Sequence, residues 1–386
     1  MRQQAFDRRQ FLRGVAATSG AMVGAASIGA GAFGLPMVGQ KTKRVILIAF
    51  AGGVRTRETF GTPANVPALQ AMADEGVLFT RARTANLGHY GAALSIFTGV
   101  SEARGIRENA RGPYPTLFEY LRKDLGLSAS DVWISTSGGA QQTNYSYSVH
   151  AEYGARYGGN TLDGDGIFNK EFKGLLERLG RPREMSNAEK ELLKKMRGGI
   201  EPRKDREGSI NSVESAAKVE EYILGELTRG TAEIRGAGAA DGKALRVARN
   251  LISLFKPKLT AVALQSADVA HDSYNGYVEV IRRNDASINE IWEAVKSDPS
   301  LADSTAIFVV PEFGRDSDLN SRRGLDHGDG SDDLRYVAGV AWGPDFKKGS
   351  VVTSDVRVID FCPTICGLLG TSAQFARGRR LKGLMA

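Results

Sequence analysis

Uninterrupted apolar runs alternate with amphipathic stretches along most of the chain. Three runs lack any polar alternation, which is typical of strands buried on both faces of a parallel sheet: they lie at 44–50, 260–265 and 306–310. Helical periodicity separates them, most clearly at 62–76, 88–99, 114–125 and 243–255. Strands that alternate with helices predict an α/β protein, a three-layer α/β/α sandwich with a mostly parallel central sheet.

The pattern changes between about residues 138 and 242. This stretch is polar and rich in glycine and charge, with only scattered helical patterns such as 188–196 and 212–228. We therefore expect one domain over 41–386, interrupted by a helical or irregular insertion at 138–242 that caps a crevice. A partly disordered arm is the alternative interpretation.

The first forty residues have the pattern of a targeting segment. Arg8 and Arg9 lie in Asp-Arg-Arg-Gln-Phe-Leu-Arg, and a stretch rich in alanine and glycine follows from 14 to 35. The segment matches the pattern of a twin-arginine signal, which directs export by transient contact with the twin-arginine machinery. It predicts a periplasmic or extracellular protein, with an uncleaved membrane tether as the alternative.

Net charge and cysteine content argue against a nucleic-acid-binding protein and against a disulfide-stabilised one. Of the seven net positive charges, three belong to the first forty residues, and the small remaining excess does not indicate a nucleic-acid partner. The two cysteines, Cys362 and Cys366, lie four apart in an apolar segment. We expect them to be small buried hydrophobic residues and not a disulfide framework.

Candidate chemistry gathers where the predicted strands end. Asp268 and His271 follow the strand at 260–265, Glu312 follows the strand at 306–310, and His327 lies in a loop rich in glycine and aspartate. Parallel strands place such residues at one crevice, and a set of carboxylate and imidazole groups suits zinc-type metals.

Two arginines also follow predicted strands. Arg55 and Arg315 are positioned to grip an anionic substrate through paired hydrogen bonds, or else to form surface ion pairs. The many aspartates between 316 and 333 predict a solvated acidic loop rather than a calcium site.

The order of these segments resembles the alkaline phosphatase and sulfatase superfamily. The resemblance rests on motifs in a fixed order, over 43–130 and 255–386: Val-Ile-Leu-Ile-Ala-Phe, Pro-Ala-Leu-Gln-Ala-Met-Ala-Asp-Glu-Gly, Leu-Ser-Ile-Phe-Thr-Gly, Asp268-x-x-His271, Val-Val-Pro-Glu312-Phe-Gly and Asp326-His327-Gly. It implies an alkaline-phosphatase-like fold and hydrolysis of a small anionic substrate, a phosphate or sulfate ester.

The resemblance also implies a divalent metal, with zinc first and manganese, iron or calcium as alternatives. Asp268, His271 and His327 match one metal position, and Glu312 is a further candidate ligand. The chain departs from the family at Ala51 and Phe313, where ligands of a second metal are expected. The nucleophile position falls at His89, which makes His89 and Glu312 the candidate catalytic residues.

Three mechanisms remain open. In the first, a single metal activates water, and His89 or Glu312 acts as general base or stabilises the transition state. In the second, His89 is a covalent nucleophile. In the third, catalysis has been lost and the crevice serves a binding or assembly function. An exported metal-dependent hydrolase is the leading expectation.

Overall fold

The computed structural model describes residues 40–101, 110–137, 142–163, 234–353 and 356–381. All of these lie in one compact unit, residues 33–386. Residues 1–39, which hold most of the predicted signal segment, lie outside the described residues. In the part of the chain that is described, no helix combines the length and the apolarity needed to cross a bilayer.

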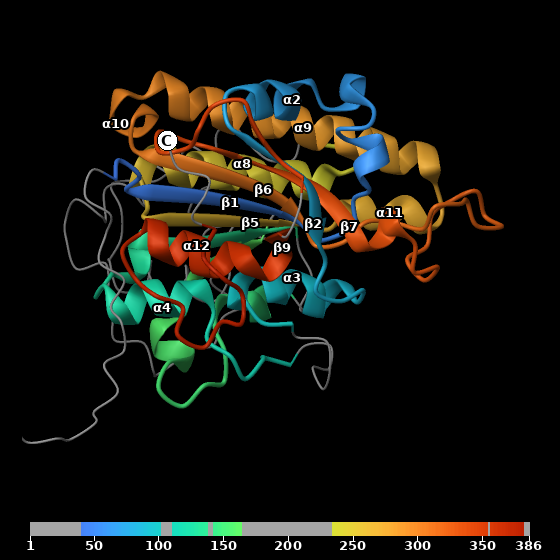
Figure 1. The fold of residues 1–386 in the computed structure, drawn as a ribbon. Helices are drawn as coiled ribbons and strands as arrows, with labels where there is room; N and C mark the ends of the chain where they lie inside the picture. The colour runs from blue at the N-terminus through green and yellow to red at the C-terminus, as the bar shows by residue number, and fades with distance from the viewer. Residues whose placement is uncertain (1–39, 102–109, 138–141, 164–233, 354–355, 382–386) are drawn as a thin grey trace, which may run out of the picture. The chain divides into compact units, whose positions relative to one another are not determined.

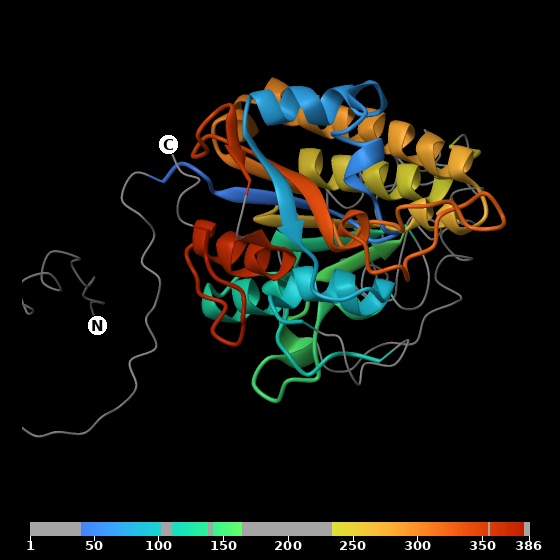
Figure 2. The ribbon, with the colours of Figure 1, turned by 45° about the vertical axis from the view of Figure 1, so that its right-hand side comes forward.

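A nine-stranded sheet forms the centre of the described unit, in the order β4-β3-β5-β1-β6-β7-β2-β8, with β9 paired to β2. The strands are β1 (Arg44–Phe50), β2 (Val77–Arg83), β3 (Val132–Thr136), β4 (Asn160–Asp163), β5 (Leu259–Leu264), β6 (Thr305–Pro311), β7 (Tyr336–Trp342), β8 (Ser350–Val352) and β9 (Val356–Arg357). The five strands from β4 to β6 are parallel, whereas β7 is antiparallel to both of its neighbours. Figure 2 shows β2 and β7 side by side. The predicted mostly parallel sheet is confirmed.

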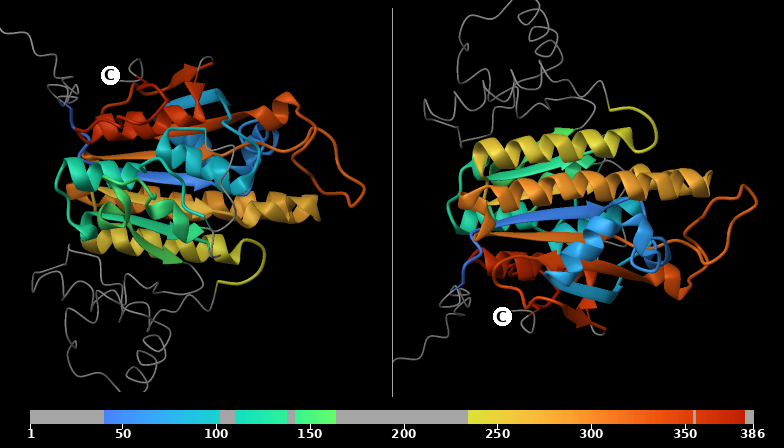
Figure 3. Two further views of the ribbon diagram at one scale, coloured as in Figure 1. Left: turned by 90° about the horizontal axis from the view of Figure 1, so that it is seen from below. Right: turned by 90° about the horizontal axis from the view of Figure 1, so that it is seen from above.

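Helices cover both faces of this sheet (Figure 1, Figure 3). The α-helices are α2 (Pro67–Asp74), α3 (His89–Thr98), α4 (Leu117–Asp124), α8 (Ala239–Phe255), α9 (Tyr274–Ser297), α10 (Pro299–Ala302), α11 (Asp332–Arg335) and α12 (Phe361–Leu368). Helices α2, α8 and α9 pack on one face, and α3, α4 and α12 pack on the other. This is the predicted three-layer α/β/α arrangement.

Strand β1 shows why an unbroken apolar run is needed in the middle of the sheet. Its side chains alternate between the two faces, as in any strand. Val45, Leu47 and Ala49 pack under α3, α4 and α12. Ile46 and Ile48 pack under α2, α8 and α9, so both faces of the strand are buried.

The described part of the predicted insertion is not separate from the sheet. Residues 142–163 form two short 3-10 helices and then β4, which pairs with β3 as the edge strand. Helix α8 begins at Ala239, close to the predicted end of the insertion. Residues 164–233, which make up most of it, lie outside the described residues.

Cys362 and Cys366 lie on successive turns of α12, and both thiols are free and buried. The predicted role as small buried hydrophobic residues is confirmed.

Helix α2 is capped by a residue of α9 instead of its own N-cap. The N-cap position is Val66, whose side chain has no acceptor. The Asp285 carboxylate of α9, only 2% exposed, accepts hydrogen bonds from Ala68 N at 3.0 Å and Leu69 N at 2.9 Å. This contact ties two helices of one layer together and satisfies N–H groups that a helix start leaves without partners.

We expect Asp285→Ala to lower the free energy of unfolding by about 1–3 kcal/mol, because two buried N–H groups lose their acceptor. Asp285→Asn keeps one acceptor oxygen and should lose less. Urea denaturation measures both, with Asp303→Ala at an exposed position as the control. A loss for Asp285→Ala no larger than that of the control would contradict the capping role.

Candidate metal-binding and active site

The site forms at the carboxyl ends of three adjacent parallel strands. Strand β1 pairs with β5 on one side and β6 on the other. β5 leads into the 3-10 helix η6 (Ser266–His271), and β6 leads directly to Glu312. Open α/β sheets form their ligand crevices where neighbouring strands send the chain in different directions.

Four residues from three segments of the chain converge there. His89, Asp268, His271 and His327 each offer one ligand atom, and these atoms lie within 4.8 Å of one another. His89 is the first residue of α3, and His327 lies in the loop from β6 to α11. Three imidazole nitrogens and one carboxylate oxygen form a set that zinc and related ions prefer.

Two of the histidines are oriented by carboxylates behind them. His89 Nδ1 lies 2.5 Å from Glu312 Oε1, and His271 Nδ1 lies 2.6 Å from Asp326 Oδ1. A carboxylate at Nδ1 holds the ring proton there and leaves the Nε2 lone pair for a metal. Both Nε2 atoms face Asp268 Oδ1, at 2.8 Å from His89 and 3.3 Å from His271.

The polar atoms of the site fit a bound cation. His89 Nε2 is buried and, despite its 2.8 Å contact, has no well-directed hydrogen bond within the described structure. A buried nitrogen in such a poorly directed contact lacks part of the stabilisation that a full hydrogen bond gives. A divalent ion held by His89 Nε2 and Asp268 Oδ1, together with His271 and His327, would supply that stabilisation.

Burial and neighbouring charges shift the pKa values of the site residues in different directions. Burial disfavours the charged form of His89, but the charges of Glu312 and Asp268 outweigh it and raise its pKa to about 9. Near pH 7 a metal would therefore have to displace the proton on His89 Nε2. Burial and the neighbouring cations lower the pKa of His327 to about 4, so this ring is neutral near pH 7. Burial opposes ionisation of Asp268, yet His89 and Arg315 hold the pKa of its carboxyl well below the usual range.

Phe313 forms an apolar wall against two of the histidines. Its ring is fully buried and lies 4.8 Å from the ring centre of His89 and 5.1 Å from that of His327. The packing restricts both imidazoles to their orientations in the site. Because a phenyl ring has no ligand atom, the position supports the site sterically and cannot coordinate a metal.

Solved structures share this architecture at low sequence identity. The chain is similar to the alkaline phosphatase PafA (TM-score 0.58, 10% identity, 89% of this chain and 99% of that chain covered). It is also similar to the phosphonate monoester hydrolase SpPMH from Silicibacter pomeroyi (0.53, 14%, 88% and 76%) and to the lipoteichoic acid synthase LtaP from Listeria monocytogenes (0.53, 11%, 88% and 76%). No family model matches the chain, and no curated protein matches it.

The fold is that of the alkaline phosphatase superfamily. The expectation drawn from the order of the sequence motifs is therefore confirmed for the fold. Because identities of 9–14% carry no information on reaction or substrate, the side chains of the site decide what this alkaline-phosphatase-like domain can do.

The structure brings together the predicted metal residues Asp268, His271 and His327. It places His89, predicted from the sequence only as a catalytic residue, in the same group as a fourth source of a ligand atom. Glu312, predicted both as a ligand and as a catalytic residue, lies behind His89 and is not part of that group. Its position at the end of β6 was visible in the sequence, but its orientation was not.

The two predicted substrate-binding arginines occupy different places. Arg315 is fully buried and reaches the site, with Nη2 at 2.7 Å from Asp268 Oδ1. Arg55 is 3% exposed, and its guanidinium binds the Glu58 carboxylate at 2.5 and 2.8 Å. Arg55 also donates to the carbonyls of Asp316 and Ser317, so it anchors the loop near the site.

The acidic loop supports the site through two of its aspartates. Asp326 holds His271, a contact that the sequence did not indicate although Asp326 directly precedes His327. Asp316 Oδ1 accepts hydrogen bonds from Gly328 N at 2.6 Å and Asp329 N at 2.9 Å, which fixes the loop immediately after His327.

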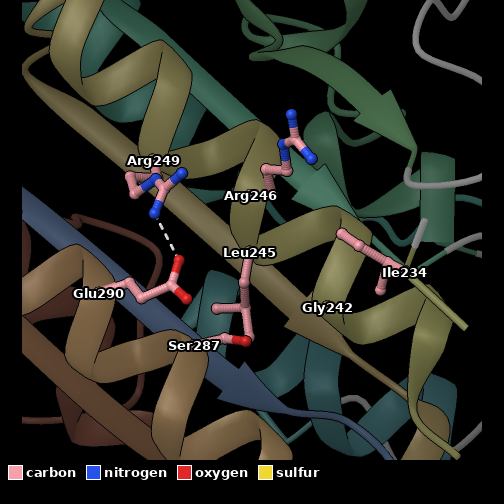
Figure 4. A pocket seen from close by; sticks show the side chains of 7 residues that line it. All are labelled: Ile234, Gly242, Leu245, Arg246, Arg249, Ser287 and Glu290. Atoms are coloured by element: carbon pink, nitrogen blue, oxygen red, sulfur yellow. Dashed lines mark hydrogen bonds and ion pairs between the residues drawn. The ribbon is translucent and has the colours of Figure 1, made fainter. Parts of the chain in front are cut away.

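A separate cavity of about 350 Å³ lies between α8 and α9 (Figure 4). Arg249 and Glu290 form an ion pair across it, and Arg246 and Ser287 add polar groups. None of the four converging residues lines it. The cavity is therefore not the crevice in which the candidate chemistry lies.

We expect Glu312→Ala to weaken zinc binding by about 10–100-fold, because His89 loses the carboxylate that orients it. Glu312→Gln retains an acceptor oxygen and should bind within a few-fold of the wild type. Competition titration against a chromophoric chelator measures both, with circular dichroism as the check on folding. Unchanged affinity in a folded Glu312→Ala protein would contradict the orienting role.

Proposed function

We propose that the protein is a metal-dependent hydrolase of phosphate or sulfate esters, or of related anionic esters. One observation carries the proposal. His89 and His271 each have a carboxylate at Nδ1 and turn Nε2 toward Asp268, in one group with His327. This is the outer-shell arrangement that orients metal-binding histidines.

The fold supports this reaction class by analogy. Two of the similar structures are a phosphonate monoester hydrolase and an alkaline phosphatase, as their names state. We propose a small anionic ester as substrate and zinc as the first candidate metal, with manganese, iron or calcium as alternatives. When bound, such an ion acts as a Lewis acid that polarises the ester and makes water more acidic.

The residues of the chain then have distinct tasks. Glu312 keeps the proton of His89 at Nδ1, and Asp326 does the same for His271. Phe313 excludes water from one side of His89 and His327. Ser95 of α3 donates to Gly91 O and accepts from Asn86 Nδ2. We propose water as the nucleophile, since a bound divalent ion makes water more acidic.

A non-catalytic binding or assembly protein is the second candidate. It is favoured by Phe313, which fills space beside His89 with a ring that cannot coordinate a metal, and by Ala51, whose side chain is buried in the core. Under this alternative the crevice retains its polar residues for binding alone.

Metal content and ester hydrolysis, measured together, distinguish the two candidates. We expect the purified protein to hold near-stoichiometric metal by elemental mass spectrometry, and to hydrolyse aryl phosphates or aryl sulfates. His271→Ala should lose both, since it removes a ligand atom. The control is His150→Ala, because His150 packs against Tyr153 and Phe375 outside the site.

Metal without hydrolysis of any anionic ester would favour the binding protein. Absence of metal from a folded sample that also fails to take it up would refute the proposed hydrolase.

We also propose that the protein is exported by the twin-arginine route to the periplasm or beyond, with an uncleaved tether as the alternative. Replacing Arg8 and Arg9 together with lysine should retain the protein in the cytoplasm, since the pathway requires the arginine pair. Cell fractionation and immunoblotting measure this, with Arg2→Lys as the control. Unchanged export of the double variant would contradict the proposal.

A further inference from the structure

Among the described residues of the site, Arg315 carries a permanent positive charge, and every one of its N–H donors has an acceptor. An arginine guanidinium carries five such donors in a rigid plane. Nε donates to Gly53 O at 3.2 Å, and Nη1 donates to Leu325 O at 3.3 Å. Nη2 donates to Gly52 O. The remaining two donors point into the site, from Nη2 to Asp268 Oδ1 at 2.7 Å and from Nη1 to His271 Nε2 at 3.2 Å.

The backbone after β1 is shaped to admit this guanidinium. Gly53 has φ +66°, and a Cβ atom there would lie 2.8 Å from Arg315 Nε. A Cβ at Gly52 would lie 2.5 Å from Gln265 O of the neighbouring segment. Only glycine fits at both positions, so the turn that follows β1 forms a cradle for Arg315. The side chain is 0% exposed, which gives its position little freedom.

The two atoms that Arg315 holds in the site are also atoms that a metal would need. A neutral imidazole has a single lone pair on the nitrogen that lacks the proton, and Asp326 keeps the proton of His271 at Nδ1. The Nε2 lone pair can therefore accept from Arg315 or bind a metal, but not both. Asp268 Oδ1 already lies within 3.3 Å of His89, His271 and Arg315, so a cation that binds this oxygen takes the place of an existing contact.

We propose that Arg315 is a built-in cation that competes with a divalent metal for His271 Nε2 and Asp268 Oδ1. In the metal-free protein the guanidinium neutralises Asp268 and closes the site. Metal binding requires Arg315 to release these two atoms, while its three backbone carbonyl contacts keep it nearby. The inference rests on the proposed function, because it concerns the same site, and it assigns Arg315 control over metal affinity.

Removal of a residue that merely supports the site should weaken zinc binding. Removal of a competing cation should instead strengthen it. Arg315→Gln should bind zinc at least about tenfold more tightly than the wild type, since a charge-assisted competitor has been removed. The same variant should melt at a lower temperature than the wild type when both are free of metal. Added zinc should recover more of the melting temperature in Arg315→Gln than in the wild type.

Chelator-competition titration and thermal melting of the full chain, with and without zinc, test this. Arg122→Gln is the matched control, because Arg122 is also buried and donates to the carbonyls of Arg156 and Gly158, away from the site. It should lower stability without tightening zinc binding. If Arg315→Gln fails to fold, Arg315→Lys keeps the charge but not the five-donor plane, and it should bind zinc more tightly than the wild type by a smaller factor.

Equal or weaker zinc binding by a folded Arg315 variant would overturn the competition, whereas the proposed function would stand if the wild type binds zinc. Zinc binding by the variant but not by the wild type would support the competition and refute the metal-dependent function of the native protein. Zinc binding by neither protein would overturn both.

Discussion

The carboxylate of Asp268 is the interaction on which the site depends. Its Oδ1 atom lies within 3.3 Å of the imidazole of His271 in its own 3-10 helix, and of the His89 imidazole and the Arg315 guanidinium from two other segments. A partly buried anion requires compensating charge, and each of these neighbours would be costly to bury without it. Asp268 thereby holds His89, His271 and Arg315 close to one another although they come from three segments of the chain.

Because β1 pairs in parallel with β5 and β6, the segments that follow these three strands can meet. The register pairs Phe50 with both Leu264 and Pro311, so the three strands end at the same level of the sheet. The segments that follow therefore start side by side: glycines after β1, Asp268 after β5, and Glu312 with Arg315 after β6. The antiparallel strand β7 lies beyond β6 and contributes no residue to the four that converge.

Ala51 and Phe313, which stand where metal ligands were expected, have packing roles in this arrangement. Ala51 lies in the core, and Phe313 packs against His89 and His327 as an apolar support. Arg315 supplies a permanent positive charge to the site and is held by the backbone carbonyls of Gly52, Gly53 and Leu325. The site thus combines an alkaline-phosphatase-like frame with a permanent cation of its own.

Much of the fold was predictable from local pattern. The buried strands at 44–50, 260–265 and 306–310 were evident because strands covered on both faces must be apolar throughout. Asp268 and His271 could be singled out because metal-binding residue types follow a strand end, and His327 because the order of the motifs resembles a known superfamily. The edge strand at 160–163 was not evident, because a short strand in a polar stretch has no pattern that distinguishes it from a loop.

The sequence by itself determined the layer architecture, the candidate metal residues and the edge of the sheet at which they meet. Tertiary structure alone decided which atom faces which. Asp326 is 55 residues from His271, and Arg315 is 47 residues from Asp268, so no local periodicity relates them. The orientation of an imidazole or guanidinium depends on hydrogen bonds from loops that pack only after the sheet has formed. For that reason the ligand types could be read along the chain, whereas the contacts that orient them and the competing cation could not.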